Sequence, residues 1–168
     1  MGAIRVSPRH FRKVVSSMKI NIHLVPEDGA HFDGEDPAGI LDVKDHEWTF
    51  TKPVNHSLDA TLLDDALLVT GRIWTDGSVR CSRCLKEFSQ RLEVNEFTFH
   101  HPITSQDIVD LTPEIRESIL LEIPQKPLCR ADCKGLCPVC GIDRNKQSCH
   151  CAREANDLRW AGLDNLKL

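Results

Sequence analysis

The sequence predicts a β-rich α+β protein, with a curved antiparallel sheet built as a meander, one main helix and a cysteine-rich C-terminal tail. Three observations predict this fold. Apolar residues alternate along much of residues 18–100, one helical pattern begins near residue 113, and six of the eight cysteines lie between Cys129 and Cys151. A chain of 168 residues is long enough for one ordinary domain with an appendage.

The N-terminal part predicts three short strands. Residues 20–24 alternate strictly between apolar and polar, as in a half-buried strand. The acidic segment 26–39 is typical of turns, and residues 40–43 predict a second strand. Residues 56–63 alternate weakly and predict a third.

The clearest β segment covers residues 66–100. Apolar residues dominate 67–74, and the dipeptide Asp76-Gly77 that follows is typical of a hairpin turn. A long return strand is expected from about Phe88 to Phe99. Together these segments predict a meander.

The main helix is expected over residues 113–123. Thr112 suits the N-cap, and Pro113 suits the first helical position. Pro124 would end the helix. One helical face would then pack on the sheet through the isoleucines spaced by four, Ile115, Ile119 and Ile123.

Composition divides the chain into a basic N-terminal appendage (1–17), a β-rich domain (18–127) and the cysteine-rich tail (128–168). The appendage holds four basic residues and no acidic one, and either Met1 or Met18 is the true start. Because basic residues interrupt any apolar run there, no secretory signal is expected. We expect a cytoplasmic protein, or one in a plastid-type organelle if the appendage is a targeting remnant.

The eight cysteines indicate metal sites rather than disulfides or buried packing. Without a secretory signal the thiols should stay reduced, and reduced cysteines in clusters favour metal. The segment 81–84 is one C-x2-C pair, and 137–141 has the Cys-Pro-x-Cys-Gly form of a zinc knuckle. The predicted ligands are Cys81, Cys84, Cys129, Cys133, Cys137, Cys140, Cys149 and Cys151.

Eight ligands make two closed tetrahedral sites, which predicts two structural zinc ions and a zinc-stabilised tail. Grouping along the chain puts the last four cysteines together in a local site and leaves Cys81, Cys84, Cys129 and Cys133 as a long-range site. This grouping is favoured because the local site closes at little cost in loop entropy. The rival joins Cys81 and Cys84 with Cys137 and Cys140. His150 is read as a spacer, although it could replace a cysteine, and four thiolates suit iron as well as zinc.

Several segments together resemble the YceD family, the large ribosomal RNA subunit accumulation proteins. They are CSRCL at 81–85, IRESILL at 115–121, PLC at 127–129, CKGLCPVCG at 133–141 and CHC at 149–151. The resemblance runs from about Met18 to the end of the chain. It implies a bacterial or plastid-type protein needed for synthesis, processing or stability of 23S ribosomal RNA. Some members lack the later tail cysteines and keep equivalents of Cys81 and Cys84, which favours the grouping along the chain.

Charge is distributed unevenly, although the net charge is only −4. Residues 20–65 are strongly acidic, whereas basic residues gather near both cysteine regions, where they either balance thiolate charge or contact RNA phosphate. Three tryptophans, Trp48, Trp74 and Trp160, and the pair His100-His101 are more typical of structural positions. The candidate RNA contacts are Arg80, Arg83, Lys86, Arg130, Lys134, Arg144 and Lys146.

The sequence contains no catalytic motif that can be placed, so we expect a protein that is not an enzyme. The expected partners are precursor RNA of the large ribosomal subunit, ribosomal proteins, or both, and no membrane or small-molecule substrate. Two other classes stay open. One is a metal-dependent RNA-processing enzyme, and the other is a thiol redox switch, although no βαβ pattern surrounds the C-x2-C pairs.

Overall fold

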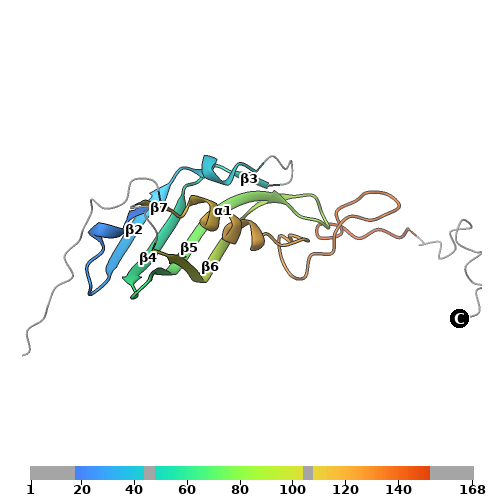
Figure 1. Cartoon of the computed structure of the whole chain (residues 1–168). Coiled ribbons are helices and arrows are strands. Elements are labelled where there is room, and N and C mark those ends of the chain that lie inside the picture. Colours follow the sequence, from blue (N-terminus) through green and yellow to red (C-terminus); the bar gives the residue numbers. More distant parts are fainter. Residues whose placement is uncertain (1–17, 44–47, 104–107, 152–168) are drawn as a thin grey trace, which may run out of the picture. The chain divides into compact units, whose positions relative to one another are not determined.

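The computed structural model describes residues 18–43, 48–103 and 108–151, which form two compact units (Figure 1). The first unit combines the chain up to Val79 with Glu87–Gln125. The second combines Arg80–Lys86 with the chain from Lys126 onward. The predicted basic appendage 1–17 and residues 152–168 of the predicted tail lie outside the described residues.

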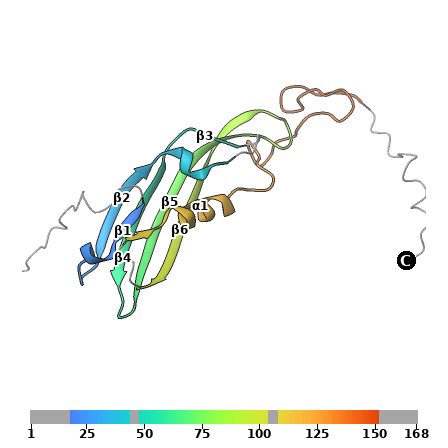
Figure 2. The same cartoon turned by 45° about the horizontal axis from the view of Figure 1, so that its top comes forward.

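The first unit is built on a five-stranded sheet that curls, as Figure 2 shows. Its strands are β2 (Ala30–Asp36), β3 (Trp48–Phe50), β4 (Val54–Leu62), β5 (Ala66–Arg80) and β6 (Glu87–Pro102). The order is β2-β4-β5-β3, and β6 also pairs with β5. The predicted meander is therefore confirmed for β4, β5 and β6, which follow one another in both chain and sheet.

A two-stranded antiparallel sheet and one α-helix complete this unit. Strand β1 (Lys19–Asn21) pairs with β7 (Ile108–Asp110), and helix α1 (Thr112–Leu121) follows directly. The helix contacts β6, and its Ile115 and Ile119 side chains have no exposed surface. Their spacing of four residues places both on the face that packs on the sheet, as the sequence predicts.

The apolar core of the described residues lies entirely in the first unit. It combines one face of the curled sheet with α1 and with β1 and β7. Among these residues, no helix is long or apolar enough to span a membrane. The largest fully buried aliphatic side chains are Met18, Ile20, Leu41, Leu67, Ile73, Leu111, Ile115 and Ile119.

The strand predicted at residues 20–24 is mostly wrong. Only β1 is extended there, and the 3-10 helix η1 (Ile22–Leu24) follows it. The Asn21 side chain accepts a hydrogen bond from the backbone N–H of His23 at 3.0 Å, and Val25 N–H bonds Ile22 O at 3.1 Å. This local capping ends the strand despite its alternating pattern.

The predictions for residues 26–43 are also wrong. The acidic stretch read as turns contains β2, and the expected strand at 40–43 is replaced by the 3-10 helix η2 (Ala38–Leu41). Strand β2 lies at the edge of the sheet, so only Phe32 among its side chains supplies a large apolar contact to the core. Asp33 and Glu35 are exposed and the carboxylic residue Asp36 is buried, so the strand lacks the alternation of apolar and polar residues that a hydrophobicity pattern detects.

The turn predicted at Asp76-Gly77 is wrong, because β5 continues through both residues and the connection to β6 lies at the Cys81–Cys84 segment. Gly77 serves close packing instead. A Cβ atom there would lie 2.7 Å from the Phe50 ring and 2.8 Å from the Trp48 ring. The absence of a side chain at Gly77 thus leaves room for the two stacked rings of β3 to pack on β5.

Helix α1 is confirmed, but its predicted cap is wrong. Thr112 is the first helical residue, and its backbone N–H donates to the Asp110 carboxylate at 2.9 Å. The Asp110 side chain thus satisfies a helix N-terminal donor from the end of β7. Burial raises the pKa of Asp110, but the hydrogen bonds from Thr112 and the nearby Lys19 ammonium together outweigh burial and lower that pKa.

Candidate metal centres

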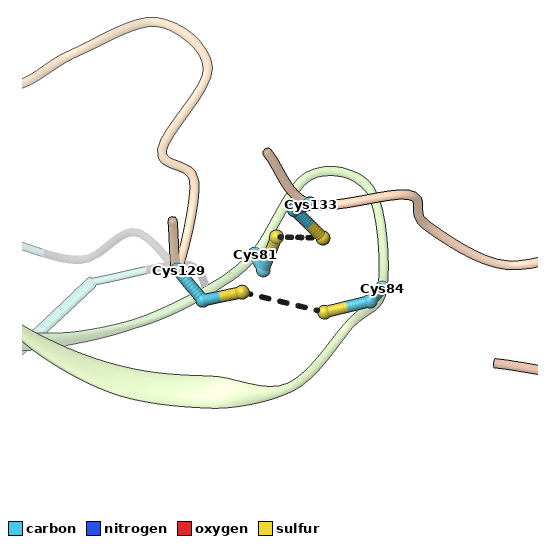
Figure 3. A group of neighbouring side chains, drawn as sticks. All are labelled: Cys81, Cys84, Cys129 and Cys133. Carbon is cyan, nitrogen blue, oxygen red and sulfur yellow. Dashed lines mark hydrogen bonds between the residues drawn. The ribbon is translucent and has the colours of Figure 1, made fainter. Parts of the chain in front are cut away.

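Four cysteine sulfurs of the second unit meet in one group, which we call tetrad 1 (Figure 3). Cys81 and Cys84 come from the connection between β5 and β6, and Cys129 and Cys133 come from the chain after α1. All four sulfurs lie within 4.8 Å of one another. Cys81 has no exposed surface and Cys133 has 2%.

The sulfur spacing of tetrad 1 fits a tetrahedral metal site. A tetrahedron with metal–sulfur bonds of about 2.3 Å has edges of about 3.8 Å. The Cys81–Cys133 sulfurs are 3.8 Å apart and the Cys84–Cys129 sulfurs 3.7 Å apart. A disulfide would need about 2.05 Å, and all eight cysteines are free thiols.

The backbone around tetrad 1 favours a thiolate at Cys81. Burial raises the pKa of the Cys81 thiol, but the backbone N–H groups of Cys129, Cys84 and Arg83 outweigh burial and lower that pKa to about 6. Burial, with the neighbouring thiols, raises the pKa of Cys129 to about 12. Tetrad 1 therefore favours one thiolate and opposes a second. A divalent cation would relieve the repulsion between the thiolates.

The last four cysteines, Cys137, Cys140, Cys149 and Cys151, form tetrad 2, again with all sulfurs within 4.8 Å. The structure thus adopts the grouping along the chain rather than the rival grouping. Tetrad 2 is more open, because Cys140 and Cys151 are exposed. Backbone N–H groups of Cys140 and Val139 lower the pKa of Cys137 to about 6.

The two C-x2-C segments fold in the same way. In the first, Leu85 N–H bonds Cys81 O at 3.0 Å and Cys81 N–H bonds Lys86 O at 2.9 Å. In the second, the same two bonds join Gly141 to Cys137 at 2.9 Å and Cys137 to Ile142 at 2.8 Å. The residue after each second cysteine has positive φ, 58° at Leu85 and 73° at Gly141. Both segments are therefore knuckles that aim N–H groups at sulfur.

Two glycines of the second unit should differ in their tolerance of alanine. Gly141→Ala should cost about 1 kcal/mol, because φ is positive but nothing lies within 4 Å of the new Cβ. Gly135→Ala should cost more, because its φ is also positive and its Cβ would lie 2.9 Å from the Arg83 carbonyl oxygen. Chelator titration of metal retention, followed by circular dichroism, measures the difference. Equal losses would contradict the prediction.

All seven candidate RNA contacts lie in the second unit and are exposed, and their role stays a prediction. Two of them also support the fold. The Arg83 guanidinium donates to the Cys133 carbonyl at 2.9 Å. The Arg130 guanidinium donates to the Asn145 side chain at 2.8 Å and lies 3.3 Å from the Asp132 carboxylate.

Sequence reasoning missed Asn145 as part of the site. Its side-chain NH2 lies 3.5 Å from the Cys133 sulfur, although Asn145 belongs to the segment between Cys140 and Cys149. The pattern Asp143-x-Asn145 indicates a turn, and the two residues do bond to each other. No sequence signal shows that this turn reaches the other tetrad.

The other residues singled out in the sequence, the tryptophans and histidines, lie outside the two tetrads. Trp48 is buried and stacks on Phe50, and the Arg72 guanidinium lies 4.9 Å over the Trp74 ring. His101 stacks on Phe99. His150 is exposed and is not a member of tetrad 2. Trp160 lies outside the described residues.

A polar row on β2 and β4 brings together a serine, a histidine and two carboxylates. His31 Nδ1 lies 2.7 Å from Asp59, and its Nε2 lies 3.3 Å from Asp33 and 3.4 Å from Ser57 Oγ. The hydrogen bond to Asp59 raises the pKa of His31 against desolvation, with Asp33 adding to the rise. The carboxylates favour imidazolium, which is a poor proton acceptor for the serine.

The raised pKa of His31 predicts a small pH dependence of stability. The folded-state gain is fully present below pH 6.5, the ordinary pKa, and is lost as pH rises through the folded-state pKa. Because half of the side chain is exposed, the gain should be only a few tenths of a kcal/mol. Asp59→Asn should move the pKa of His31 toward 6.5 in an NMR titration, and Ser57→Ala should not. A higher pKa in Asp59→Asn would contradict this account.

Comparison with known proteins shows which family the C-terminal part of the chain resembles. Residues 98–167 match the family model described as large ribosomal RNA subunit accumulation protein YceD. A chloroplastic protein of Arabidopsis thaliana, named a homologue of the YceD accumulation protein, is 38% identical over 72 residues, which are 43% of this chain and 22% of that protein. The C-terminal part of the chain is thus similar to the YceD family. The sequence resemblance is therefore confirmed.

Other relatives of the chain are bacterial. An uncharacterised protein of Mycobacterium tuberculosis is 33% identical over 116 residues, which cover 60% of this chain and 56% of that protein. The YlbN protein of Bacillus subtilis is 33% identical over 99 residues, covering 51% and 58%. The chain thus spans little more than half the length of these curated relatives. No solved structure matches it significantly.

Proposed function

We propose that this chain supports accumulation of large-subunit ribosomal RNA as a binding factor that is not an enzyme. Its second unit would bind RNA phosphate through a basic surface held in shape by two zinc ions. The family description and the printed name of the Arabidopsis thaliana relative support the RNA class. The cytoplasmic location, or a plastid-type one, stays a prediction.

The thiol chemistry supports zinc at both tetrads. Four cysteines at tetrahedral spacing suit a soft or borderline cation such as zinc. Tetrad 1 would hold one ion through Cys81, Cys84, Cys129 and Cys133, and tetrad 2 would hold the other. With four protein ligands each, neither site keeps an open position for water or substrate, so the ions would be structural. This argues against a metal-dependent nuclease.

The separation of charge between the two units carries the RNA proposal. The described residues of the second unit hold eight lysines and arginines against two acidic residues. Those of the first unit hold five against seventeen. Two zinc–thiolate centres would add a charge of −4, which leaves the described part of the second unit at +2. Among the described residues, RNA phosphate would therefore be attracted to the second unit rather than to the first.

The proposal is tested by removing basic side chains in matched sets. The variant Lys86→Ala/Lys134→Ala/Lys146→Ala removes three positive charges from the second unit. The control Lys19→Ala/Lys52→Ala/Arg72→Ala removes the same charge from the first unit. Binding to large-subunit precursor particles is measured by cosedimentation over a range of salt concentrations. For three lost phosphate contacts the slope of log affinity against log salt should become shallower by about two to three.

The control set should leave that slope unchanged. Equal effects of the two variants, or no binding by the unmodified chain, would overturn the proposal. If binding survives nuclease digestion of the particle RNA and the salt slope is unchanged, the partner is a ribosomal protein and the proposal of an RNA contact is wrong.

A further inference from the structure

The segment closed by tetrad 2 reaches back to tetrad 1 through Asn145. Cys140 and Cys149 of tetrad 2 flank this segment. The Asn145 NH2 group donates to the sulfur of Cys133, a member of tetrad 1, at 3.5 Å. This is a side-chain hydrogen bond from the loop of one tetrad to a ligand atom of the other, within a single compact unit.

The Asn145 amide is held in one orientation. Its Oδ1 accepts from the backbone N–H of Lys134 and from the Arg130 guanidinium, each at 2.8 Å. Its NH2 donates to the Asp143 carboxylate at 2.7 Å as well as to Cys133. A flipped amide would direct its NH2 at two donors, so only this orientation satisfies all four bonds.

Backbone hydrogen bonds also connect the loop of tetrad 2 to tetrad 1. Arg144 N–H bonds Gly135 O at 3.0 Å, and Leu136 N–H bonds Arg83 O at 3.0 Å. Gly135 and Leu136 lie in the short segment that joins Cys133 of tetrad 1 to Cys137 of tetrad 2. The loop, this segment and the first knuckle are therefore hydrogen-bonded in series.

We propose that Asn145 couples the two tetrads, so that metal bound at tetrad 2 strengthens metal binding at tetrad 1. This rests on the proposed metal sites. An N–H donor to a ligand sulfur fixes its position and reduces the charge that four thiolates concentrate on one ion. Groups of this kind change metal affinity by about 10–100-fold. Asn145 supplies one to tetrad 1 when its loop is ordered.

The exposure of the tetrads sets the order in which they release metal. Two sulfur ligands of tetrad 2 belong to exposed cysteines, whereas Cys81 and Cys133 of tetrad 1 are buried. A competing chelator therefore reaches tetrad 2 first. Loss of metal from tetrad 2 frees the loop and withdraws the Asn145 donor, which lowers the affinity of tetrad 1 for metal. Metal release is thus sequential, and the occupancy of the exposed tetrad regulates the buried one.

The coupling is tested on the full chain by competition with a chromophoric zinc chelator. Asn145→Asp keeps the acceptor for Lys134 and Arg130 and removes the donor to Cys133. Cys149→Ser/Cys151→Ser removes tetrad 2 and leaves only the affinity of tetrad 1 to be measured. Each variant should weaken zinc binding at tetrad 1 by about tenfold or more. Together they should weaken it little further, because both remove the same donor. Ser148→Ala, on the same loop, is the control and should change nothing.

Two readouts separate coupling from general damage to the loop. In the cobalt-substituted protein, Asn145→Asp should shift the sulfur-to-cobalt charge-transfer band of tetrad 1, and Ser148→Ala should not. Removal of tetrad 1 by Cys129→Ser should weaken tetrad 2 by the same factor, because coupling is reciprocal. Two zinc ions bound with independent affinities would overturn the coupling alone. Fewer than two ions bound by the unmodified chain would overturn the proposed metal sites as well.

Discussion

Removing metal with a strong chelator should unfold the second unit and leave the first unit folded, and replacing Cys133 by serine should unfold the part of the second unit around tetrad 1. The clustered apolar core of the described residues belongs to the first unit. Among the described residues of the second unit, the buried hydrophobic ones are all cysteines, namely Cys81, Cys133 and Cys137. A unit with so little apolar burial depends on metal, and structural zinc contributes about 10–16 kcal/mol of apparent binding free energy.

Amide NMR spectra measure this outcome unit by unit. Resonances of residues 80–86 and 126–151 should collapse to random-coil positions, while those of the buried strands β4 and β5 up to Val79 should keep their dispersion. Zinc added back should restore the spectrum of the unmodified chain but not that of Cys133→Ser. The control Ser148→Ala should stay folded. Simultaneous unfolding of both units, or unfolding of neither, would contradict the prediction.

Gly71→Ala should destabilise the first unit by about 3 kcal/mol or more. Gly71 lies in the interior of β5 and pairs with Leu58 of β4. An added Cβ would clash with the Ser57 carbonyl oxygen and would lie 2.8 Å from the Leu58 Cα. Both are backbone atoms of the neighbouring strand and cannot move aside alone. The φ of +151° at Gly71 adds strain for any residue with a side chain.

Gly39→Ala is the matched control, because nothing lies within 4 Å of its Cβ and its backbone conformation is ordinary. It should change stability by no more than about 0.5 kcal/mol. Urea unfolding followed by tryptophan fluorescence measures both variants, since Trp48 and Trp74 lie in the first unit. Equal midpoints for the two variants would show that the strands separate at Gly71 without cost.

The composition of the candidate site could be predicted from the sequence because ligand chemistry is local. Two C-x2-C pairs and four further cysteines name the donors, and a short loop between ligands favours the grouping that the structure adopts. Asn145 could not be predicted, because its bond to the Cys133 sulfur depends on how two loops meet. Spacing along the chain carries no information on that contact.

The errors in the fold have a similar origin. Strand β2 has a single large apolar side chain in the core, so its pairing with β4 rather than its own pattern makes it a strand. The dipeptide Asp76-Gly77 is typical of a turn, but Gly77 lies within β5, where the rings of Phe50 and Trp48 pack against it. In both places a neighbour distant in the sequence overrides the local preference.

The sequence by itself determined the β-rich class, the long β5–β6 segment, helix α1 and the eight candidate metal ligands. Each of these depends on periodicity or on ligand type, which are properties of the local chain. Only the tertiary structure decided that Arg80–Lys86 joins the tail in one unit, that the charges separate between the units, and that Asn145 connects the two tetrads. These features depend on contacts between distant segments, and such contacts form only when the chain folds.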